Sequence, residues 1–367
     1  MVAIKIARAR RRLTLGAELC LTIGSATTGR DREIVFRHLG WSGEVPIALR
    51  ALGEDYGITG ERVRQIISGF ARRVAQSNAL RSILDQILYE IELNSPAVAA
   101  DLERKLSRAF GAPALRVEAV CATAEVFGRQ VLVAIESVGS LRLIVHKRDI
   151  GLAREILRQG RKLVSHFGIS SISEVCKRIA GRTVVGSKTV RGVLGTMKSL
   201  HWLDQRCEWF WLDDLVRNPL TNAATKLFSV VPRIHAKEFR AYILADRRWN
   251  QCPPPPTVVM IEFCRLACGC KIYGPYIVSN SPRTANETLS QTERIVHSIL
   301  TDGPPLLHRS KFERECLRRG IGRKTFDQYV TQLPILHRCA PDVYRLRGRK
   351  FSGDDLRRAL ASGRHSA

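Results

Sequence analysis

The sequence predicts a mainly α-helical fold with small β-hairpins, built as a row of short units along the chain. Three observations support this prediction. Apolar residues recur near the 3.6-residue spacing of helices in one segment after another. In four places a pair of short apolar strands follows such helices. The chain has 367 residues, of which 45% are hydrophobic and 25% charged, and this is enough apolar material for several buried cores.

The segment at 31–77 contains three apolar stripes of helical spacing, the last of which runs through Val63, Ile66, Ile67, Phe70 and Val74. Between the second and third stripes lie Gly57, Ile58 and Thr59. Glycine permits a left-handed turn, Ile58 can fill the space between two helices, and Thr59 can cap the helix that follows. This order predicts a helix-turn-helix at the N-terminus, whose second helix, at 59–74, offers its first side chains to the major groove.

Three polar side chains of that helix suit base recognition. Glu61 can accept a hydrogen bond from cytosine, Gln65 can bond adenine or a phosphate, and Arg64 can reach guanine or the backbone. Their spacing of i, i+3 and i+4 places them on one helix face, opposite the apolar stripe. Arg72 and Arg73 follow in the last turn, where they can contact phosphates. An ordinary amphipathic helix with a solvated polar face is the alternative; the turn residues and the net charge favour DNA.

The same residues resemble a known family. The run GITGERVRQI, preceded by DREIVFRHLGW and IALRALGEDY, looks like region 4 of bacterial sigma factors, the domain that recognises the upstream promoter element. The match is residue for residue from 61 to 66. The resemblance implies that Glu61 and Gln65 face bases and that Arg62 and Arg64 touch phosphates or bases. The predicted DNA-binding residues of this unit are Thr59, Glu61, Arg62, Arg64, Gln65, Arg72 and Arg73.

The resemblance covers residues 31–74 and departs from the family at two positions. Gly60 and Ile67 stand where the family usually has an arginine and a glutamate. Complete sigma factors have their promoter-melting and polymerase-clamping regions ahead of region 4, whereas 30 residues precede it here. We therefore expect a protein that borrows this domain rather than a complete sigma factor. RNA polymerase is a further partner that the resemblance alone implies.

The charge of the chain points to a polyanionic partner. Lys and Arg number 59 against 34 Asp and Glu, a net charge of +25. Double-stranded DNA is the expected partner, because the charge is spread along the chain rather than gathered in a membrane-binding block. No apolar run is long enough for a membrane span, and Glu18 interrupts the only signal-like start, so we expect a cytoplasmic protein without membrane contact. Residues 81–150 are neutral and are expected to pack against neighbours or a partner protein.

The rest of the chain repeats one order of elements, three helices followed by a strand pair, which is the winged-helix plan. In the first such unit a helix is expected at 96–110 and a hairpin with strands at 131–136 and 141–146. In the second the helices are expected at 152–167, 172–179 and 187–200, with strands at 201–203 and 209–212. The predicted organisation is a basic N-terminal arm at 1–30, the helix-turn-helix at 31–77, tandem winged-helix-like modules at 78–150, 151–215, 216–280 and 290–348, and a basic tail at 349–367.

The third helices of two modules begin among hydroxyls and cations. Lys188 and Arg191 lie in one, and Arg323 and Lys324 in the other. Such side chains near a helix N-terminus suit phosphate contact, so these four are predicted to bind DNA. Winged-helix units also serve in dimerisation or protein docking, and this alternative remains open for each module.

No catalytic or metal-binding pattern stands out. One cluster of cysteines has enough thiols for a zinc site: Cys252, Cys264, Cys268 and Cys270. However, Cys264 and Cys268 are four residues apart in a predicted helix. We therefore expect reduced, buried thiols and no metal. Phosphate-loop, nucleophile-elbow and zinc-protease motifs are missing from the sequence, and no enzyme activity or cofactor is expected. The sequence predicts a DNA-binding protein of transcription or its regulation. A protein-docking scaffold, or a nuclease with dispersed carboxylates, is the alternative.

Overall fold

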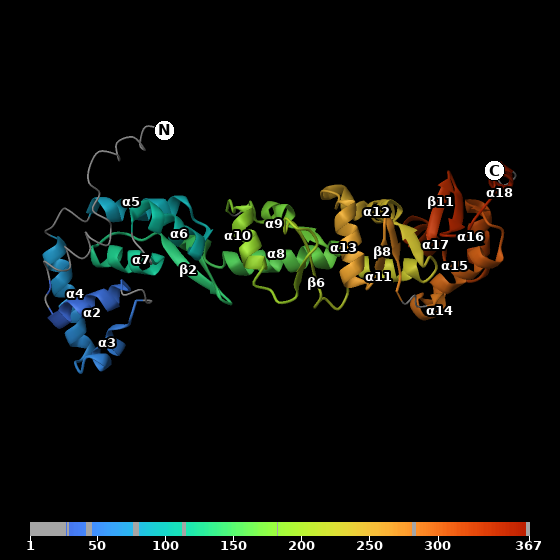
Figure 1. Ribbon diagram of the computed structural model, residues 1–367. Coiled ribbons are helices and arrows are strands. Elements are labelled where there is room, and N and C mark those ends of the chain that lie inside the picture. Colours follow the sequence, from blue (N-terminus) through green and yellow to red (C-terminus); the bar gives the residue numbers. More distant parts are fainter. Residues whose placement is uncertain are drawn as a thin grey trace, which may run out of the picture. The chain divides into compact units, whose positions relative to one another are not determined.

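The computed structural model describes residues 27, 29–41, 46–75, 81–111, 115–181, 183–280 and 284–364. The predicted arm at 1–30 lies outside these residues except for 27, 29 and 30. The chain is mainly helical, with 57% helix and small three-stranded antiparallel sheets, which confirms this part of the prediction (Figure 1). No helix in the described ranges is both long and apolar enough to cross a membrane.

The chain divides into two compact units. The first consists of Met1–Leu157 with Ile179–Thr196, and the second of Arg158–Arg178 with Met197–Ala367. The module boundaries proposed from the sequence stay predictions.

The first unit begins with three helices, α2 (Gly29–Leu39), α3 (Leu49–Asp55) and α4 (Gly60–Ala75), coloured blue in Figure 1. Gly57 has a φ of +64° and makes the turn between α3 and α4. The amide of Ile58 then donates to the carbonyl of Gly53 at 2.9 Å. A Cβ on Gly53 would lie 2.6 Å from the carbonyl oxygen of Ile58, so this glycine lets α3 approach the turn closely. Thr59 caps α4, because its hydroxyl accepts from the amide of Arg62 at 3.1 Å.

The next segment continues the same hydrophobic core. Its elements are α5 (Arg81–Leu93), β1 (Ala97–Val98), α6 (Ala99–Phe110), α7 (Val117–Val126), β2 (Val133–Val138), β3 (Leu141–His146) and the 3₁₀ turn η2 (Lys147–Asp149). One cluster of buried residues extends from Ile34 to Ile144. Phe70 of α4 packs edge-on against Phe127 at the end of α7, with ring centroids 6.2 Å apart. The three N-terminal helices and the segment at 81–150 therefore share one core.

Four segments repeat one order of elements: a helix, a short strand, two helices and a β-hairpin. The first of them begins at α5. The second has α8 (Leu152–Phe167), β4 (Ser170–Ser171), α9 (Ile172–Ile179), α10 (Ser187–Leu194), β5 (Leu200–Trp202) and β6 (Trp209–Leu212). The third has α11 (Pro219–Phe228), β7 (Arg233–His235), α12 (Ala236–Leu244), the 3₁₀ turn η3 (Arg247–Gln251), α13 (Thr257–Ala267), β8 (Lys271–Tyr273) and β9 (Tyr276–Val278).

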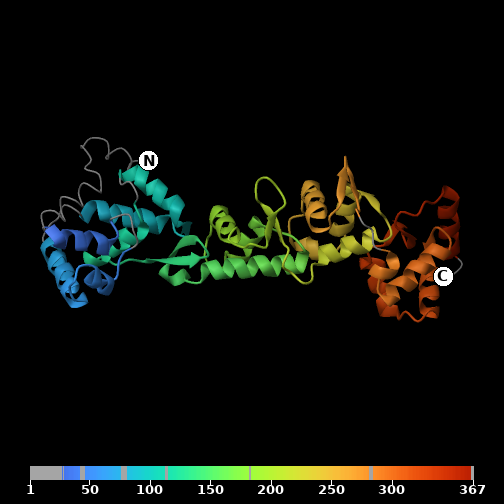
Figure 2. The same cartoon turned by 60° about the horizontal axis from the view of Figure 1, so that its bottom comes forward.

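The fourth repeat follows a single-turn helix, α14 (Ala285–Thr288). It has α15 (Gln291–Asp302), β10 (Leu307–His308), α16 (Arg309–Arg318), α17 (Arg323–Gln332), β11 (Leu336–Ala340) and β12 (Val343–Leu346). Its three helices gather beside its strands in both views (Figures 1 and 2). Residues 353–364 of the expected basic tail form a further helix, α18 (Gly353–Arg364), whose Ala359 packs against Leu306 and Val343.

The short first strand of each repeat was not predicted. In every sheet this strand pairs with the last strand of the hairpin, in the orders β1-β3-β2, β4-β6-β5, β7-β9-β8 and β10-β12-β11. The sequence predicted a continuous helix at 96–110, but Ala97 and Val98 pair with Ile144 and Leu143 before α6 begins. The helix expected at 187–200 is also shorter, ending at Leu194 beside the C-cap Gly195. Strands of two or three residues have no periodicity of their own and depend on a distant partner.

Candidate nucleic-acid interface

Helix α4 has one buried and one exposed face. Val63, Ile66, Ile67 and Phe70 are buried, with exposed fractions of 8% or less. The polar residues between them are exposed: Glu61, Arg62, Arg64 and Gln65. The apolar spacing of the sequence therefore turns the predicted base-reading side chains outward, at the end of the helix that follows the tight turn.

The exposed side chains of α4 pair with one another. Arg64 donates to both carboxylate oxygens of Glu61, from Nη2 at 2.6 Å and from Nε at 2.8 Å. Arg62 donates from Nη1 to Oε1 of Gln65 at 3.2 Å. The hydrogen bond from Arg64 lowers the pKa of Glu61, so this carboxylate is ionised and can only accept hydrogen bonds. The guanidinium group of Arg64 is thereby held against the helix surface, one turn from the N-terminus of α4.

The remaining predicted residues of this unit lie at the two ends of α4. Arg72 and Arg73 are exposed in its last turn. Thr59 is exposed before its first turn, where its hydroxyl serves as the cap. Gly60, the first residue of α4, lies where α3 crosses closely, because a Cβ there would be 3.4 Å from the Cα of Arg50.

Helix α10, in the same compact unit, holds Lys188 and Arg191. Lys188 is largely exposed and its Nζ lies 2.9 Å from Oδ2 of Asp101 on α6. Arg191 is half-buried. Two contacts fix α10 on the segment at β1: the hydroxyl of Thr189 donates to the carbonyl of Pro96 at 3.1 Å, and a Cβ on Gly192 would lie 3.0 Å from the side chain of Val98.

Helix α17, in the second unit, holds the other two predicted cations. Arg323 is exposed, and its Nε lies 3.3 Å from Oε1 of Glu313. Lys324 is exposed in the first turn. The structure thus brings α4 and α10 into one compact unit and assigns α17 to the other.

Three cations beside Lys188 are not among the residues predicted from the sequence to bind DNA. Arg104, Lys105 and Arg108 are exposed along α6 and line a hollow of about 450 Å³ together with Asp101, Ala109 and Lys188. They were missed because the segment at 81–150 has no net charge. A signal was present: the three cations lie at i, i+1 and i+4 on the helix face opposite the buried Leu102 and Leu106.

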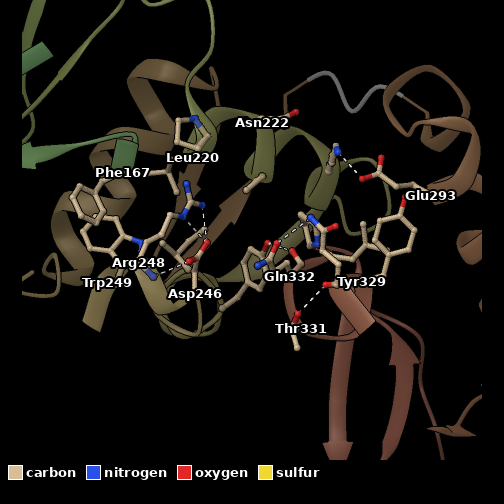
Figure 3. Close-up of a pocket in the computed structure, with 18 residues that line it drawn as sticks. Phe167, Leu220, Asn222, Asp246, Arg248, Trp249, Glu293, Tyr329, Thr331 and Gln332 are labelled. Carbon is tan, nitrogen blue, oxygen red and sulfur yellow. Dashed lines mark hydrogen bonds and ion pairs between the residues drawn. The ribbon is translucent and has the colours of Figure 1, made fainter. Parts of the chain in front are cut away.

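A second concavity, of about 310 Å³, lies within the second unit (Figure 3). Two ion pairs neutralise its charged groups: Lys226 Nζ lies 2.6 Å from Oε1 of Glu293, and Arg248 Nη2 lies 2.6 Å from Oδ2 of Asp246. What remains to face the cavity is mostly amides and rings, Asn222, Gln328, Gln332, Tyr242, Tyr329 and Trp249. Since its charges are internally balanced, the cavity offers a polyanion no attraction, and the pair between Lys226 and Glu293 holds α11 to the start of α15.

Cys264 and Cys270 are buried, and Cys252 and Cys268 are half-buried. Burial, together with a hydrogen bond that the Cys264 thiol donates to Cys268, raises the pKa of Cys264, and burial raises the pKa of Cys270 to about 12. Burial also raises the pKa of Cys252. These three thiols are therefore protonated near neutral pH. Across the described ranges, no three His, Cys, Asp or Glu side chains are placed to hold a metal ion.

No model of a known protein family matches the chain, and no curated protein matches it.

Proposed function

We propose that this protein binds double-stranded DNA through α4 and acts in the initiation of transcription or its regulation. One observation is the main support. The first two turns of α4 expose a compact set of paired donors and acceptors, while the same turns bury Val63, Ile66 and Ile67 against α2 and α3. An amphipathic helix held in this way after a tight turn is the arrangement with which helix-turn-helix proteins enter the major groove.

The paired side chains give α4 both kinds of hydrogen-bonding group that bases require. Ionised Glu61 accepts, as cytosine N4 requires, and its bidentate contact orients the guanidinium of Arg64 for a guanine edge. Gln65 can donate and accept at adenine. Arg72 and Arg73, in the last turn of α4, suit the phosphate backbone. We assign base recognition to Glu61, Arg64 and Gln65.

The resemblance to sigma factor region 4 supports the link with transcription, and with it a bacterial, cytoplasmic setting. Gly60, where the family usually has an arginine, removes one cation from the start of α4. We therefore expect a DNA target that differs from the usual promoter element, read from position 61 onward.

We also propose that the four repeats are winged-helix-like modules. Each has the order helix, strand, helix, helix, hairpin, and each sheet places the short strand next to the last one. In this proposal α10 and α17 add phosphate contacts through Lys188, Arg191, Arg323 and Lys324. Such contacts raise affinity without reading sequence.

The decisive experiment starts by selecting genomic fragments that the purified full chain binds. Affinity for a selected duplex is then measured by fluorescence anisotropy with the double variant Arg64→Ala, Gln65→Ala. We expect a loss of roughly 10-fold or more, because two base contacts disappear. Circular dichroism melting should be unchanged, since both side chains are exposed. Arg148→Ala is the control, because this arginine is 80% exposed in the same unit and away from α4. Equal affinity of the double variant and the control would refute the proposal.

A second candidate function is docking onto a protein such as RNA polymerase. Tyr89 and Leu93 lie one turn apart on α5 and are 63% and 64% exposed. An exposed apolar pair on a helix of a neutral segment favours a protein contact. If docking is the main function, core polymerase will be retained by the Arg64→Ala, Gln65→Ala variant and lost by Tyr89→Ser, Leu93→Ser.

A further inference from the structure

The segment at 81–150 is neutral by count but not in space. It has nine Lys and Arg and nine Asp and Glu. Several of its carboxylates are engaged inside the fold. Glu103 and Glu118 both bind Arg142, at 2.6 and 2.5 Å. Glu136 accepts hydrogen bonds from backbone amides at the start of α8. These carboxylates are largely buried or turned toward the protein, so they do little to neutralise cations on the far face of α6.

The exposed face of α6 keeps its cations. Arg104 shares Asp101 with Lys188, at 3.2 and 2.9 Å. Lys105 lies 3.5 Å from Oε2 of Glu90. Within the described ranges, Arg108 has no carboxylate partner. Four cations thus face two carboxylates, and the hollow that they line keeps a net positive charge.

The hollow is a product of packing between segments far apart in the sequence. Lys188 reaches α6 because α10 is fixed on the segment at β1, through Thr189 and the close approach at Gly192. These two contacts therefore also fix the position of α10 relative to α6. The cationic groups are therefore placed before any ligand arrives, which reduces the entropy lost on binding.

The lining of the hollow indicates its ligand. Its six residues are Asp101, Arg104, Lys105, Arg108, Ala109 and Lys188. None has an aromatic ring, so the site cannot stack exposed bases as single-strand binding proteins do. Guanidinium and ammonium groups around an open concavity suit the oxygens of phosphodiesters.

We propose that this hollow binds backbone phosphates of duplex DNA, as a second contact site in the unit that holds α4. The inference rests on the proposed DNA-binding function and adds to it a site in a segment that has no net charge. Binding at the hollow has no sequence preference, because phosphates are the same at every base pair. Its contribution is affinity and register.

The test measures how the binding constant for a selected duplex depends on salt. The variant is Arg104→Ala, Arg108→Ala, Lys188→Ala in the full chain. If each cation contacts one phosphate, the slope of log K against log salt becomes shallower by roughly 2 to 3, because each contact contributes about 0.9. The loss of affinity should be equal for selected and unrelated duplexes. The charge-preserving variant Arg104→Lys, Arg108→Lys, Lys188→Arg should keep the original slope.

The control is again Arg148→Ala, which should leave the slope unchanged, and circular dichroism melting verifies that the triple variant is folded. If the folded triple variant keeps the wild-type slope, the hollow binds no phosphate and the inference is wrong, while the function assigned to α4 stands. If the triple variant loses affinity only for the selected duplex, the hollow reads sequence and the inference is also wrong. If the wild-type chain binds no duplex, both proposals fail.

Discussion

Trp41 donates its indole N–H to the hydroxyl of Thr123 at 2.8 Å, across 82 residues of sequence. Thr123 is fully buried on α7, and its own hydroxyl donates to the carbonyl of Ala119 at 2.7 Å. This chain of two hydrogen bonds ties the end of α2 to the body of the segment that follows. Helices α2, α3 and α4 are therefore fixed to α7 by this polar contact as well as by the shared core.

Replacing Thr123 by valine should weaken this connection. The substitution keeps the shape but removes the acceptor, which leaves the half-buried indole N–H of Trp41 without its partner, at a cost of about 1–3 kcal/mol. Hydrogen exchange of the full chain is the suitable measurement, because it reports the stability of α4 and α7 separately from the second unit. The double variant Trp41→Phe, Thr123→Val removes both partners and should cost less than the sum of the two single variants. Additive effects would contradict this account.

A pair of glycine substitutions tests the crossing of α3 and α4. Gly53→Ala places a Cβ 2.6 Å from the carbonyl oxygen of Ile58, so the helices must separate, at a cost of about 1–3 kcal/mol. Gly69→Ala, in the middle of α4, meets only the far end of Arg73 at 3.8 Å and should stabilise the helix by about 0.5–1 kcal/mol. Exchange of α4 amides should therefore speed up in the first variant and slow down in the second. Similar changes in the exchange of α4 amides in both variants would refute the close packing of α3 against the turn before α4.

The ion pair between Lys226 and Glu293 should make the stability of the second unit depend on pH. Burial acts to raise the pKa of Glu293, but hydrogen bonds from Lys226 and Ser290 outweigh it, and the folded pKa lies below the usual value. The stabilisation is fully present above the unfolded pKa of about 4.3 and is lost as pH falls through the lower folded pKa. Calorimetry should show the unfolding temperature of this unit falling on acidification in that window.

The variant Lys226→Met should reverse this dependence. It leaves a nearly buried carboxylate without its partner, which costs about 3 kcal/mol near neutral pH. Burial then dominates and raises the pKa of Glu293, so protonation relieves the cost and the deficit shrinks as pH falls. Glu293→Gln is the control, and its stability should change least between about pH 7 and about pH 4. A deficit of Lys226→Met that stays constant with pH would show that the pair does not act electrostatically.

Glu61 should affect discrimination more than stability. Its pair with Arg64 is exposed, so Glu61→Gln should leave the melting temperature unchanged. The loss of one negative charge should strengthen binding to unrelated duplexes, while the freed Arg64 loses its orientation. The ratio of affinities for selected and unrelated duplexes should therefore fall. An unchanged ratio of affinities would show that Glu61 takes no part in base recognition.

Helices with a complete apolar stripe could be predicted from the sequence. The helix expected at 59–74 is found as Gly60–Ala75, and the strand expected at 141–146 is found at those residues. The short strands such as Ala97–Val98 could not be predicted, because backbone pairing with a distant strand forms them rather than any local pattern. The shared core at 34–144 was equally out of reach, since a boundary near residue 77 looks the same in sequence whether or not the two sides pack together.

The reading face of α4 could be predicted because the spacing of its polar residues decides their exposure. The pairing within that face, Glu61 with Arg64 and Arg62 with Gln65, needed the structure. The hollow at α6 could not be found by counting charge along the chain. Its positive character arises because Arg142 engages two carboxylates, and that depends on contacts of β3 with α6 and with α7.

The shared core makes the distance between α4 and the hollow at α6 a property of the protein. A flexible linker would let the two sites search the duplex independently and tolerate any spacing between them. Here Phe70, Phe127 and their neighbours hold both sites in one body. A duplex that touches both must extend past its recognised bases as far as the hollow, so shortening the flanking DNA on that side should abolish the gain from the second site at one fixed length.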